Sequence, residues 1–500
     1  MKKLGILSLA ALGLQSFGLP GVSIATAAVD GEWTNGKGGN WTTPGNWKDG
    51  QIADGPGATA TFGQTRIASD RGVINVGDRT VGHIVFDNDK QWNLSGGTLT
   101  LATDTPSKQP TLTVKGKGQH FIAATLEGTR GFSKSGGGRV ILSGKNTYTG
   151  PTLIRAGQLV LRSDNGFGAA GPENPTVIRH DNSWPQLHIY GGITSPESIT
   201  LSHLSPGDST GLYNDNNDNT LTGPLTLERL GRHAKPVTFG VQVISGTLTL
   251  AGPVSGKLGG GAAKAALTDD SVANRFRVGV RAKGAALVTG DISDGSIGNG
   301  GLALDKIDPG LLHLSAANTY TGGTTINAGT LLVTNTAGSA TGTGAVLIGE
   351  GATLAGTGIL APAGSNDITF GSKAVVSPGE LSPDGATRPG GKLTLALDAT
   401  TGHVTFHAGA KLSIALGNAA TGTLVVTGLA GGKERVNFND TVVELSVTGD
   451  RLADGLHTLV TFDADNAYSG ELSLGPGLDG YTASLVRNPD SIQLRIGPAP

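Results

Sequence analysis

The 500-residue sequence contains no cysteine, and aromatic residues make up only 5% of it. The absence of cysteine excludes disulfides, thiolate metal sites and a cysteine nucleophile. Charged residues amount to 15%, with 37 basic against 39 acidic side chains and no concentrated basic stripe. Nucleic-acid binding therefore has no electrostatic basis here. With so few rings, we expect a core of small aliphatic side chains.

Long apolar runs are also missing, except at the N-terminus. Two lysines precede the apolar residues 4–14, and Ala25-Thr-Ala27 fits a small-residue cleavage site,. We predict a secretory signal peptide over residues 1–27. A single membrane span is the alternative, but polar residues, Pro and Gly interrupt the run at 15–21,. No other segment approaches spanning length, so we expect no transmembrane segment in the mature chain.

Glycine is what the sequence has in excess, with 82 residues where ordinary usage is about 7%. A strict collagen triplet is absent. Residues 138–161 (GRVILSGKNTYTGPTLIRAGQLVL) and 310–333 (GLLHLSAANTYTGGTTINAGTLLV) are identical at 13 of 24 positions. Such self-similarity indicates an array of stacked structural units.

Each unit reads as three short strands. Val140 and Leu142 alternate with their neighbours, which is typical of a strand,. A second strand is predicted around Thr152 and Ile154, and a third begins at Leu159 after an Ala-Gly corner. Strands this short bury no core alone, so stacking on neighbouring units must complete them.

The Asn-Thr-Tyr-Thr-Gly segment between the first two strands is predicted to be a turn, because Asn and Gly readily adopt turn conformations. Weaker copies occur at 219–223 and 466–470. The predicted structural turn residues of the four copies are Asn146, Tyr148, Gly150 and Gly157; Asn219 and Gly223; Asn318, Tyr320, Gly322 and Gly329; and Asn466, Tyr468 and Gly470.

These segments resemble the autotransporter-associated β-strand repeat, or passenger-associated transport repeat, of bacterial surface proteins. The family pattern opens Lys-x-Gly-x-Gly-x-Leu-x-Leu-x-Gly, matched here by 134–144 and 306–316, and continues through Asn-Thr-Tyr-x-Gly and Thr-x-Ile-x-Ala-Gly-x-Leu. Asp308-Pro309 and Ala316 depart from it. The resemblance implies an all-β fold, a right-handed parallel β-helix (solenoid) with terminal caps, displayed at the cell surface.

We predict four parts along the chain. The signal peptide is followed by a Trp-rich cap at 28–66, a β-helix at 67–430 with strong repeats at 128–162 and 300–334, and C-terminal β coils or a cap at 431–500. Relatives that export themselves continue into a membrane β-barrel. Because this sequence closes at Gly497-Pro-Ala-Pro500 without a terminal aromatic residue, we expect it to lack that barrel.

Three of the five tryptophans, Trp33, Trp41 and Trp47, fall within 15 residues. One interpretation is a platform on which sugar rings stack. The other, which we favour, is a cap that covers the strand edges of the first coil.

Catalytic and metal motifs are weak. Residues 207–211 fit the Gly-x-Ser-x-Gly nucleophile elbow, but a helix should follow and an Asn/Asp run does,. His403 and His407 have the spacing of a helical zinc pair, whereas on a strand they would lie ~13 Å apart. Residues 215–219 begin like a calcium loop, yet Thr220 and Thr226 stand where Gly and Glu are required,. We therefore predict no catalytic, cofactor-binding or metal residues.

The preferred hypothesis is an exported, non-catalytic structural or adhesin-like surface protein. A polysaccharide lyase or hydrolase using Asp215, Asp218, Arg229 and Arg232 is one alternative, and a carbohydrate-binding protein using the tryptophans is another. Expected partners are an extracellular polysaccharide or the surface of a host or neighbouring cell, and no cofactor is expected. The expected location is the cell surface or the medium, with the periplasm as the alternative.

Overall fold

The computed structural model describes residues 27–497 except 64–70, 182, 205–206, 231–235, 260–273, 298–299, 382–387, 399–400, 419, 430–433, 448–451, 477 and 479. Residues 1–26 of the predicted signal peptide and the candidate Arg232 lie outside the described residues.

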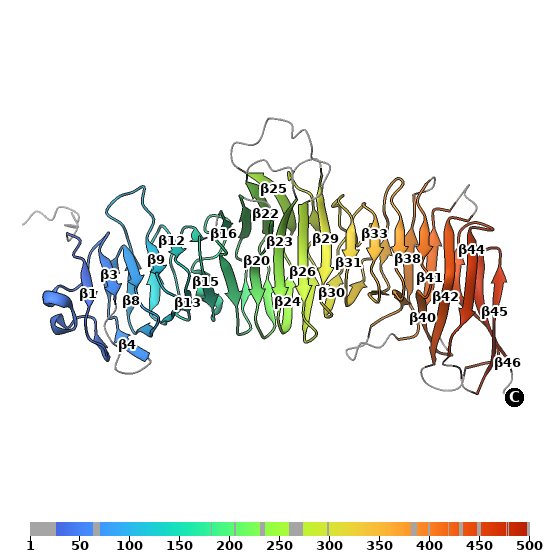
Figure 1. The fold of residues 1–500 in the computed structure, drawn as a ribbon, viewed down its shortest axis with the longest axis horizontal. Coiled ribbons are helices and arrows are strands. Elements are labelled where there is room, and N and C mark those ends of the chain that lie inside the picture. The colour runs from blue at the N-terminus through green and yellow to red at the C-terminus, as the bar shows by residue number, and fades with distance from the viewer. Residues whose placement is uncertain are drawn as a thin grey trace, which may run out of the picture.

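The chain winds into an elongated rod of stacked coils, with the N-terminal coils at one end and the C-terminal coils at the other (Figure 1). Successive coils pair through parallel strands, and the last strands of the described chain pair antiparallel. The predicted parallel β-helix is confirmed. Within the described ranges the only helices are short 3-10 turns, and none of them is long and apolar enough to cross a bilayer.

Three long ladders of parallel strands form the faces of the rod. The first ladder contains β1 (Gly31–Trp33), β3 (Thr59–Phe62), β6 (His83–Phe86), β9 (Thr111–Val114), β12 (Phe132–Ser135), β14 (Thr152–Ile154), β16 (Thr176–His180), β19 (Ile199–His203), β22 (Leu225–Leu230), β25 (Val254–Gly259) and β28 (Ile292–Ser293). The second contains β2 (Gly38–Asn40), β4 (Arg71–Asn75), β7 (Gln91–Ser95), β10 (Gln119–Ile122), β13 (Arg139–Leu142), β15 (Gln158–Leu161), β17 (Gln186–Ile189), β20 (Gly207–Asn214), β23 (Val237–Val243), β26 (Asn274–Val280), β29 (Leu302–Ile307), β31 (Thr324–Ile326), β33 (Val346–Ile348), β36 (Ile368–Phe370) and β39 (Val404–Phe406). The third contains β18 (Thr194–Ser195), β21 (Asn219–Leu221), β24 (Gly246–Leu250), β27 (Gly284–Val288), β30 (Leu311–Leu314), β32 (Thr330–Val333), β34 (Thr353–Gly356), β37 (Val375–Pro378) and β40 (Lys411–Leu416).

Smaller elements complete the two ends. The long strand β42 (Val436–Val447) pairs with both β39 and β40, and thus joins the second and third ladders before β44 (Tyr468–Leu474). The remaining strands are β5 (Arg79–Val81), β8 (Thr98–Leu101) and β11 (Thr125–Glu127) in one sheet, and β35 (Ile359–Leu360), β38 (Lys392–Ala396), β41 (Thr423–Thr427), β43 (Gly455–Phe462), β46 (Ser491–Gly497) and β45 (Thr482–Asn488) in another. The 3-10 turns are η1 (Pro44–Asn46), η2 (Lys48–Gly50) and η3 (Asp164–Phe167).

The core runs along the rod axis and consists mainly of Leu, Ile and Val from alternate strand positions. This alternation is why period-two patterns locate the strands: β9, for example, buries Leu112 and Val114 and turns its threonines outward,. Rings from successive coils stack on one another at Phe370, Phe406 and Phe438, whose successive centroids are 4.4 and 4.9 Å apart.

The two strong repeats occupy different faces. In the first copy β12 and β14 belong to the first ladder and β13 and β15 to the second. In the second copy the equivalent strands β29 and β31 lie in the second ladder, and β30 and β32 in the third. Longer strands such as β20 and β26 lie between the copies. The chain path has therefore advanced by one face from one copy to the other.

An arginine covers the edge of the last parallel strand. Along one edge β44 pairs with β42. Arg487 of β45 donates from Nη1 to the carbonyl of Gly470 (3.1 Å) and from Nη2 to that of Leu472 (3.4 Å). Two edge carbonyls thus have side-chain rather than strand partners.

Candidate functional site

The asparagines of the strong repeats join neighbouring coils. Asn146 is buried; its Oδ1 accepts from the backbone N of Leu126 (3.0 Å) in the preceding coil, and its Nδ2 donates to the carbonyl of Gly166 (3.2 Å) in the next. Asn318 makes the equivalent contacts, accepting from a backbone N–H (2.7 Å) and donating to a carbonyl. Each amide acts like an additional peptide group between strands. The side chains of Asn146 and Asn318 thus bridge neighbouring coils, a contact that the predicted turn did not include.

The tyrosines of the same segments are internal as well. Tyr148 and Tyr320 are buried, and their hydroxyls pair with Thr152 (2.9 Å) and Thr324 (2.5 Å), four residues further on. Burial raises the pKa of both tyrosines. The Thr that opens the second strand of the unit therefore satisfies the buried hydroxyl, which sequence reasoning did not foresee.

A lysine in each repeat is completely buried. Lys134 Nζ donates to three carbonyls, those of Ser135 (3.0 Å), Gly136 (2.9 Å) and Ala156 (3.0 Å). Lys306 donates in the same way to residues 307, 308 and 328. Burial lowers the pKa of Lys134 to about 7 and that of Lys306 to about 8, the latter raised in part by Asp308. Each ammonium ties a corner to the next coil, and the family pattern contained the signal as its leading Lys.

The remaining predicted turn residues have mixed environments. Gly157 and Gly329 form equivalent corners with φ of 65° and 73°. Gly150 also has positive φ, whereas in the second copy this conformation belongs to the residue after Gly322. In the weaker copies, Asn219 accepts from the backbone N of residues 192 and 193, and a Cβ on Gly223 would meet the carbonyl of residue 197.

The last copy differs from the strong ones. Asn466 adopts φ of 57°, which is a turn conformation, and Gly470 has φ of 90°. Tyr468 is half-buried, and its hydroxyl donates to the carbonyl of Asn488 (2.9 Å). Asn466 makes no bridge of the Asn146 kind among the contacts of the described residues.

The N-terminal tryptophans are not a surface platform. Trp33, Trp41 and Trp47 are buried, and their rings meet edge to face at centroid distances of 5.1 Å (Trp33–Trp47) and 5.0 Å (Trp41–Trp47). Each indole N–H donates to a backbone carbonyl. With faces and N–H groups engaged inside the first coils, these rings are unavailable to a sugar.

The described carboxylate and arginine candidates of the enzyme hypothesis have separate partners. Asp215 pairs with His188, and Asp218 accepts from the backbone N of Thr247 (2.8 Å). Arg229 is buried on β22 and lies 3.4 Å from Asn274 Oδ1. Asp215 and Asp218 thus have different partners, each of which joins neighbouring coils.

The other sequence motifs are accounted for by strands and corners. Residues 207–211 belong to β20 and are not followed by a helix. His403 and His407 flank β39 at its two ends. Residues 215–218 form the corner between β20 and β21. Among the described residues there is no group of three or more His, Asp or Glu placed to hold a metal ion.

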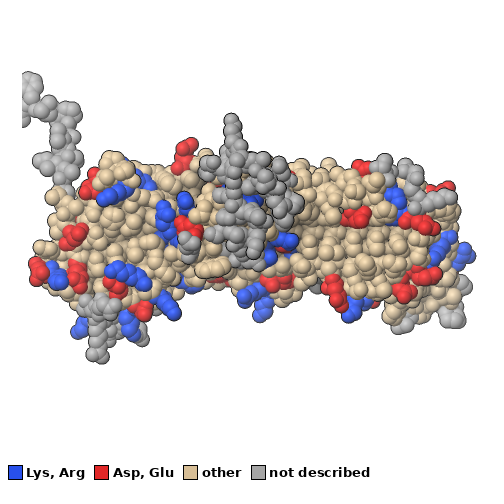
Figure 2. Space-filling view, turned by 45° about the horizontal axis from the view of Figure 1, so that its top comes forward, with Lys and Arg blue, Asp and Glu red and all other residues tan. Residues whose placement is uncertain are grey.

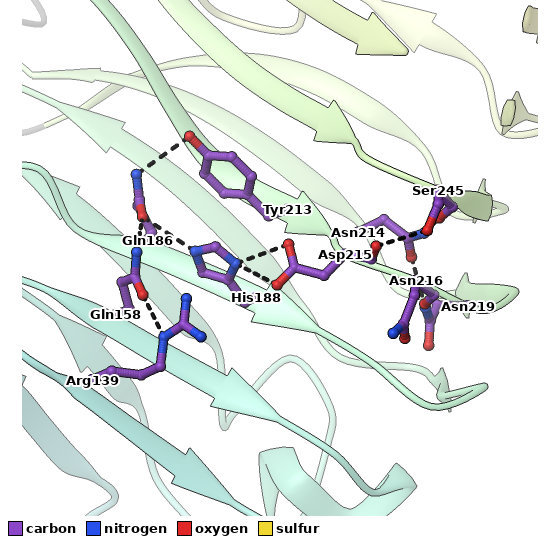
Figure 3. Close-up of polar contacts among 10 residues, drawn as sticks. All are labelled: Arg139, Gln158, Gln186, His188, Tyr213, Asn214, Asp215, Asn216, Asn219 and Ser245. Carbon is purple, nitrogen blue, oxygen red and sulfur yellow. Dashed lines mark hydrogen bonds and ion pairs between the residues drawn. The ribbon is translucent and has the colours of Figure 1, made fainter. Parts of the chain in front are cut away.

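A polar row crosses β13, β15, β17 and β20 on the outside of the second ladder (Figure 3). Arg139 Nε donates to Gln158 Oε1 (2.5 Å), and Gln158 Nε2 to Gln186 Oε1 (2.7 Å). The His188 ring stacks on Tyr213 with centroids 4.5 Å apart, and its Nδ1 lies 2.8 Å from Asp215. The row connects four successive coils.

The His188–Asp215 pair has the geometry of an oriented base. However, His188 Nε2 lies 3.1 Å from Gln186 Oε1, so its second nitrogen is engaged. No Ser or Thr hydroxyl contacts the ring in the described part of the row. Hydrogen bonding to His188 helps to hold the pKa of Asp215 below its usual value despite burial. The arrangement stabilises the stacking of coils and offers no activated nucleophile.

The corner next to this row contains an exposed indole that sequence reasoning overlooked. Trp184 is 65% exposed, whereas the other four tryptophans are buried. Its ring packs edge to face on His180 at 4.8 Å. Asp181 Oδ2 lies 3.6 Å from Arg179 Nε and 3.9 Å from Arg155 Nη1. We call Arg155, Arg179, Asp181 and Trp184 the Trp184 corner. Asp181 and Trp184 lie between β16 and β17, Arg179 lies on β16, and Arg155 directly follows β14.

The fold and its duplicated unit define a parallel β-helical repeat protein. Residues 132–161 and 304–333 match the family model Passenger-associated-transport-repeat. The chain thus carries two such repeats, and the buried Lys, Asn and Tyr contacts fall inside both.

Known proteins provide two comparisons. The chain is 38% identical over 116 residues to the "Adhesin BmaC autotransporter" of Brucella suis biovar 1 (strain 1330), a match covering 23% of this chain and 3% of that protein. It therefore spans only a small fraction of this relative. The Haemophilus influenzae Hap adhesin structure aligns over 89% of this chain and 65% of its own, at 12% identity and a TM-score of 0.19, which is too low to support an argument.

Proposed function

We propose that this chain is an exported, adhesin-like passenger-type protein that acts at the cell surface as a stiff, non-catalytic β-helical rod. The observation that carries the proposal is the pair of passenger-associated transport repeats within one continuous parallel β-helix. The partial similarity to an autotransporter adhesin supports it.

The surface fits this role. Figure 2 shows basic and acidic side chains in small mixed groups on a largely uncharged face. The duplicated contacts connect coil to coil inside the rod and leave outward positions free to vary. A solenoid of this kind offers a long contact surface.

Surface location can be tested by cell fractionation combined with protease shaving of intact cells. We expect the chain to be degraded by external protease while a soluble periplasmic marker stays intact. Recovery of the chain only in the protected periplasmic fraction would contradict the proposal. Adhesion of cells with and without the gene to polysaccharide-coated surfaces tests the adhesive part.

A further inference from the structure

The Trp184 corner has the composition of a ligand site. Among the described Trp, Tyr and Phe residues, only Trp184 is mostly exposed to solvent. An exposed indole offers a flat apolar face beside a polar N–H, which suits contact with an amphipathic ligand.

Trp184 lies in the connection from β16 to β17, residues 181–185, of which the structure describes all but 182. The equivalent connection from β33 to β34 has four residues, 349–352, and the connection from β14 to β15 has three, 155–157. The exposed indole is thus found in the longest of these three connections.

The indole is supported by a stack of rings. His180 packs on one side of Trp184, and the His180 and His203 rings are stacked with centroids 5.0 Å apart and an 11° interplanar angle. His203 in turn packs edge to face on the buried Phe239 at 5.0 Å. Burial lowers the pKa of both histidines, which keeps the stack neutral at pH 7. A ring held in this way loses little freedom on binding.

Charge selects the kind of ligand. The guanidinium groups of Arg155 and Arg179 flank the single carboxylate of Asp181, and both arginine side chains are about half exposed. Arg179 Nε itself is buried, so a ligand would meet the exposed remainder of this guanidinium. The corner thus has one positive charge in excess, in a chain of net charge −2. Guanidinium groups bind carboxylates in a planar, bidentate manner.

We infer that the Trp184 corner binds an acidic polysaccharide, with the Trp184 indole stacked on a sugar ring and Arg155 and Arg179 bound to sugar carboxylates. This inference deepens the proposed adhesive function and rests on it for its biological setting. The sugar C–H face matches the indole, and the carboxylate matches the guanidinium pair.

Binding is measured by calorimetry and by tryptophan fluorescence, using the purified full chain and oligogalacturonate, with methyl-esterified oligogalacturonate as the uncharged control. We expect W184A and the double variant R155Q/R179Q each to weaken binding by about tenfold or more. The methyl ester should bind weaker by a similar factor. W184F should retain binding to within about threefold, because an aromatic face remains.

Two further variants make the test specific. D181N removes the carboxylate that competes with the ligand, so it should tighten binding by about threefold. K373Q removes an exposed positive charge from a distant coil and should leave binding within about twofold,. Melting curves matching the wild type show that the variants are folded.

Two results would overturn the inference. One is failure of the wild-type chain to bind oligogalacturonate, hyaluronate and alginate. The other is equal binding by the wild type, W184A and R155Q/R179Q. Protease shaving measures whether the chain is exposed on the cell surface and does not depend on sugar binding. A chain that is exposed on the surface but binds no uronic acid therefore refutes only this inference. A chain that binds but stays protected in the periplasm refutes only the proposed surface function.

Discussion

The repeats at 132–161 and 304–333 have nearly the same interior, although they face different sides of the rod. Lys134 and Lys306 each donate to three carbonyls, and Asn146 and Asn318 each bridge to the coils on both sides. Their outward positions differ. The cross-coil pair Arg139 and Gln158 in the first copy is replaced by residues 311 and 330, a Leu and a Thr, in the second. The two copies therefore share the buried lysine and asparagine contacts that connect neighbouring coils, which we call the joint.

The residues of the repeat therefore fall into two groups, those that both copies share and those that differ between them. The shared residues satisfy backbone groups that stacking would otherwise leave buried without partners. The variable residues decide what each face presents to the outside. Because the second copy is displaced by one ladder, the same joint displays a different surface.

The largest expected effect comes from the buried lysines. Replacing Lys134 or Lys306 by Met leaves three carbonyls without their donor, and we expect each change to lower the free energy of unfolding by about 3 kcal/mol. Urea denaturation followed by far-UV circular dichroism measures it. K373M on the exposed surface is the control. If K134M and K306M lower the free energy of unfolding no more than K373M does, the buried lysines do not hold neighbouring coils together.

Next in size are the asparagine bridges. N146G and N318G should each cost about 2 kcal/mol, since a backbone N–H and a carbonyl lose their partner. N466G should be neutral or slightly stabilising, because Asn466 lies at positive φ, where Gly is favoured,. Equal losses in all three variants would show that Asn146 acts as a turn residue after all.

The hydroxyl pairs are expected to contribute less. Y148F and Y320F each remove one buried hydrogen bond to a Thr hydroxyl and should cost about 1 kcal/mol,. The second change in Y148F/T152V should add little, because the unpaired hydroxyl is removed with it. Strictly additive losses in this double-mutant cycle would exclude the coupling.

The smallest expected effect is the difference between the pKa values of Lys134 and Lys306, to which Asp308 contributes. Their folded pKa values of about 7 and 8 lie below the 10.5 of an exposed lysine. The unfolded chain therefore binds more protons between about pH 8 and 10.5, and stability should rise with pH across that window. K134M/K306M should flatten the rise. D308N should lower the Lys306 pKa toward that of Lys134 in a 13Cε NMR titration, and an unchanged value would contradict the role of Asp308.

Much of the fold was accessible from the sequence. Alternation around Val140 and Leu142 predicts strands because one face of each strand must be buried. The role of Asn146 was not accessible, since its side chain replaces a peptide group and local turn preference points elsewhere. The sugar platform, which was the less favoured interpretation of the tryptophan cluster, does not fit the structure, because Trp33, Trp41 and Trp47 bury one another in the first coils.

The candidate site was harder to predict because coil length varies. Arg139 meets Gln158 across 19 positions, whereas Gln158 meets Gln186 across 28. Without the coil boundaries, no spacing rule places His188 beside Asp215, or His180 beside His203 under Trp184. Trp184 lies in the connection at 181–185, whose bounds only the ends of β16 and β17 reveal.

Arg487 has a consequence for how these rods coexist in a crowded environment. Each coil of a parallel β-helix is a template for the next, so a bare terminal strand could recruit a strand from another molecule and begin a fibre. At β44 the incoming chain would have to displace a guanidinium from the carbonyls of Gly470 and Leu472, with Glu471 3.9 Å away as its counter-ion. Arg487 thus makes the pairing of another strand at this edge of β44 less favourable.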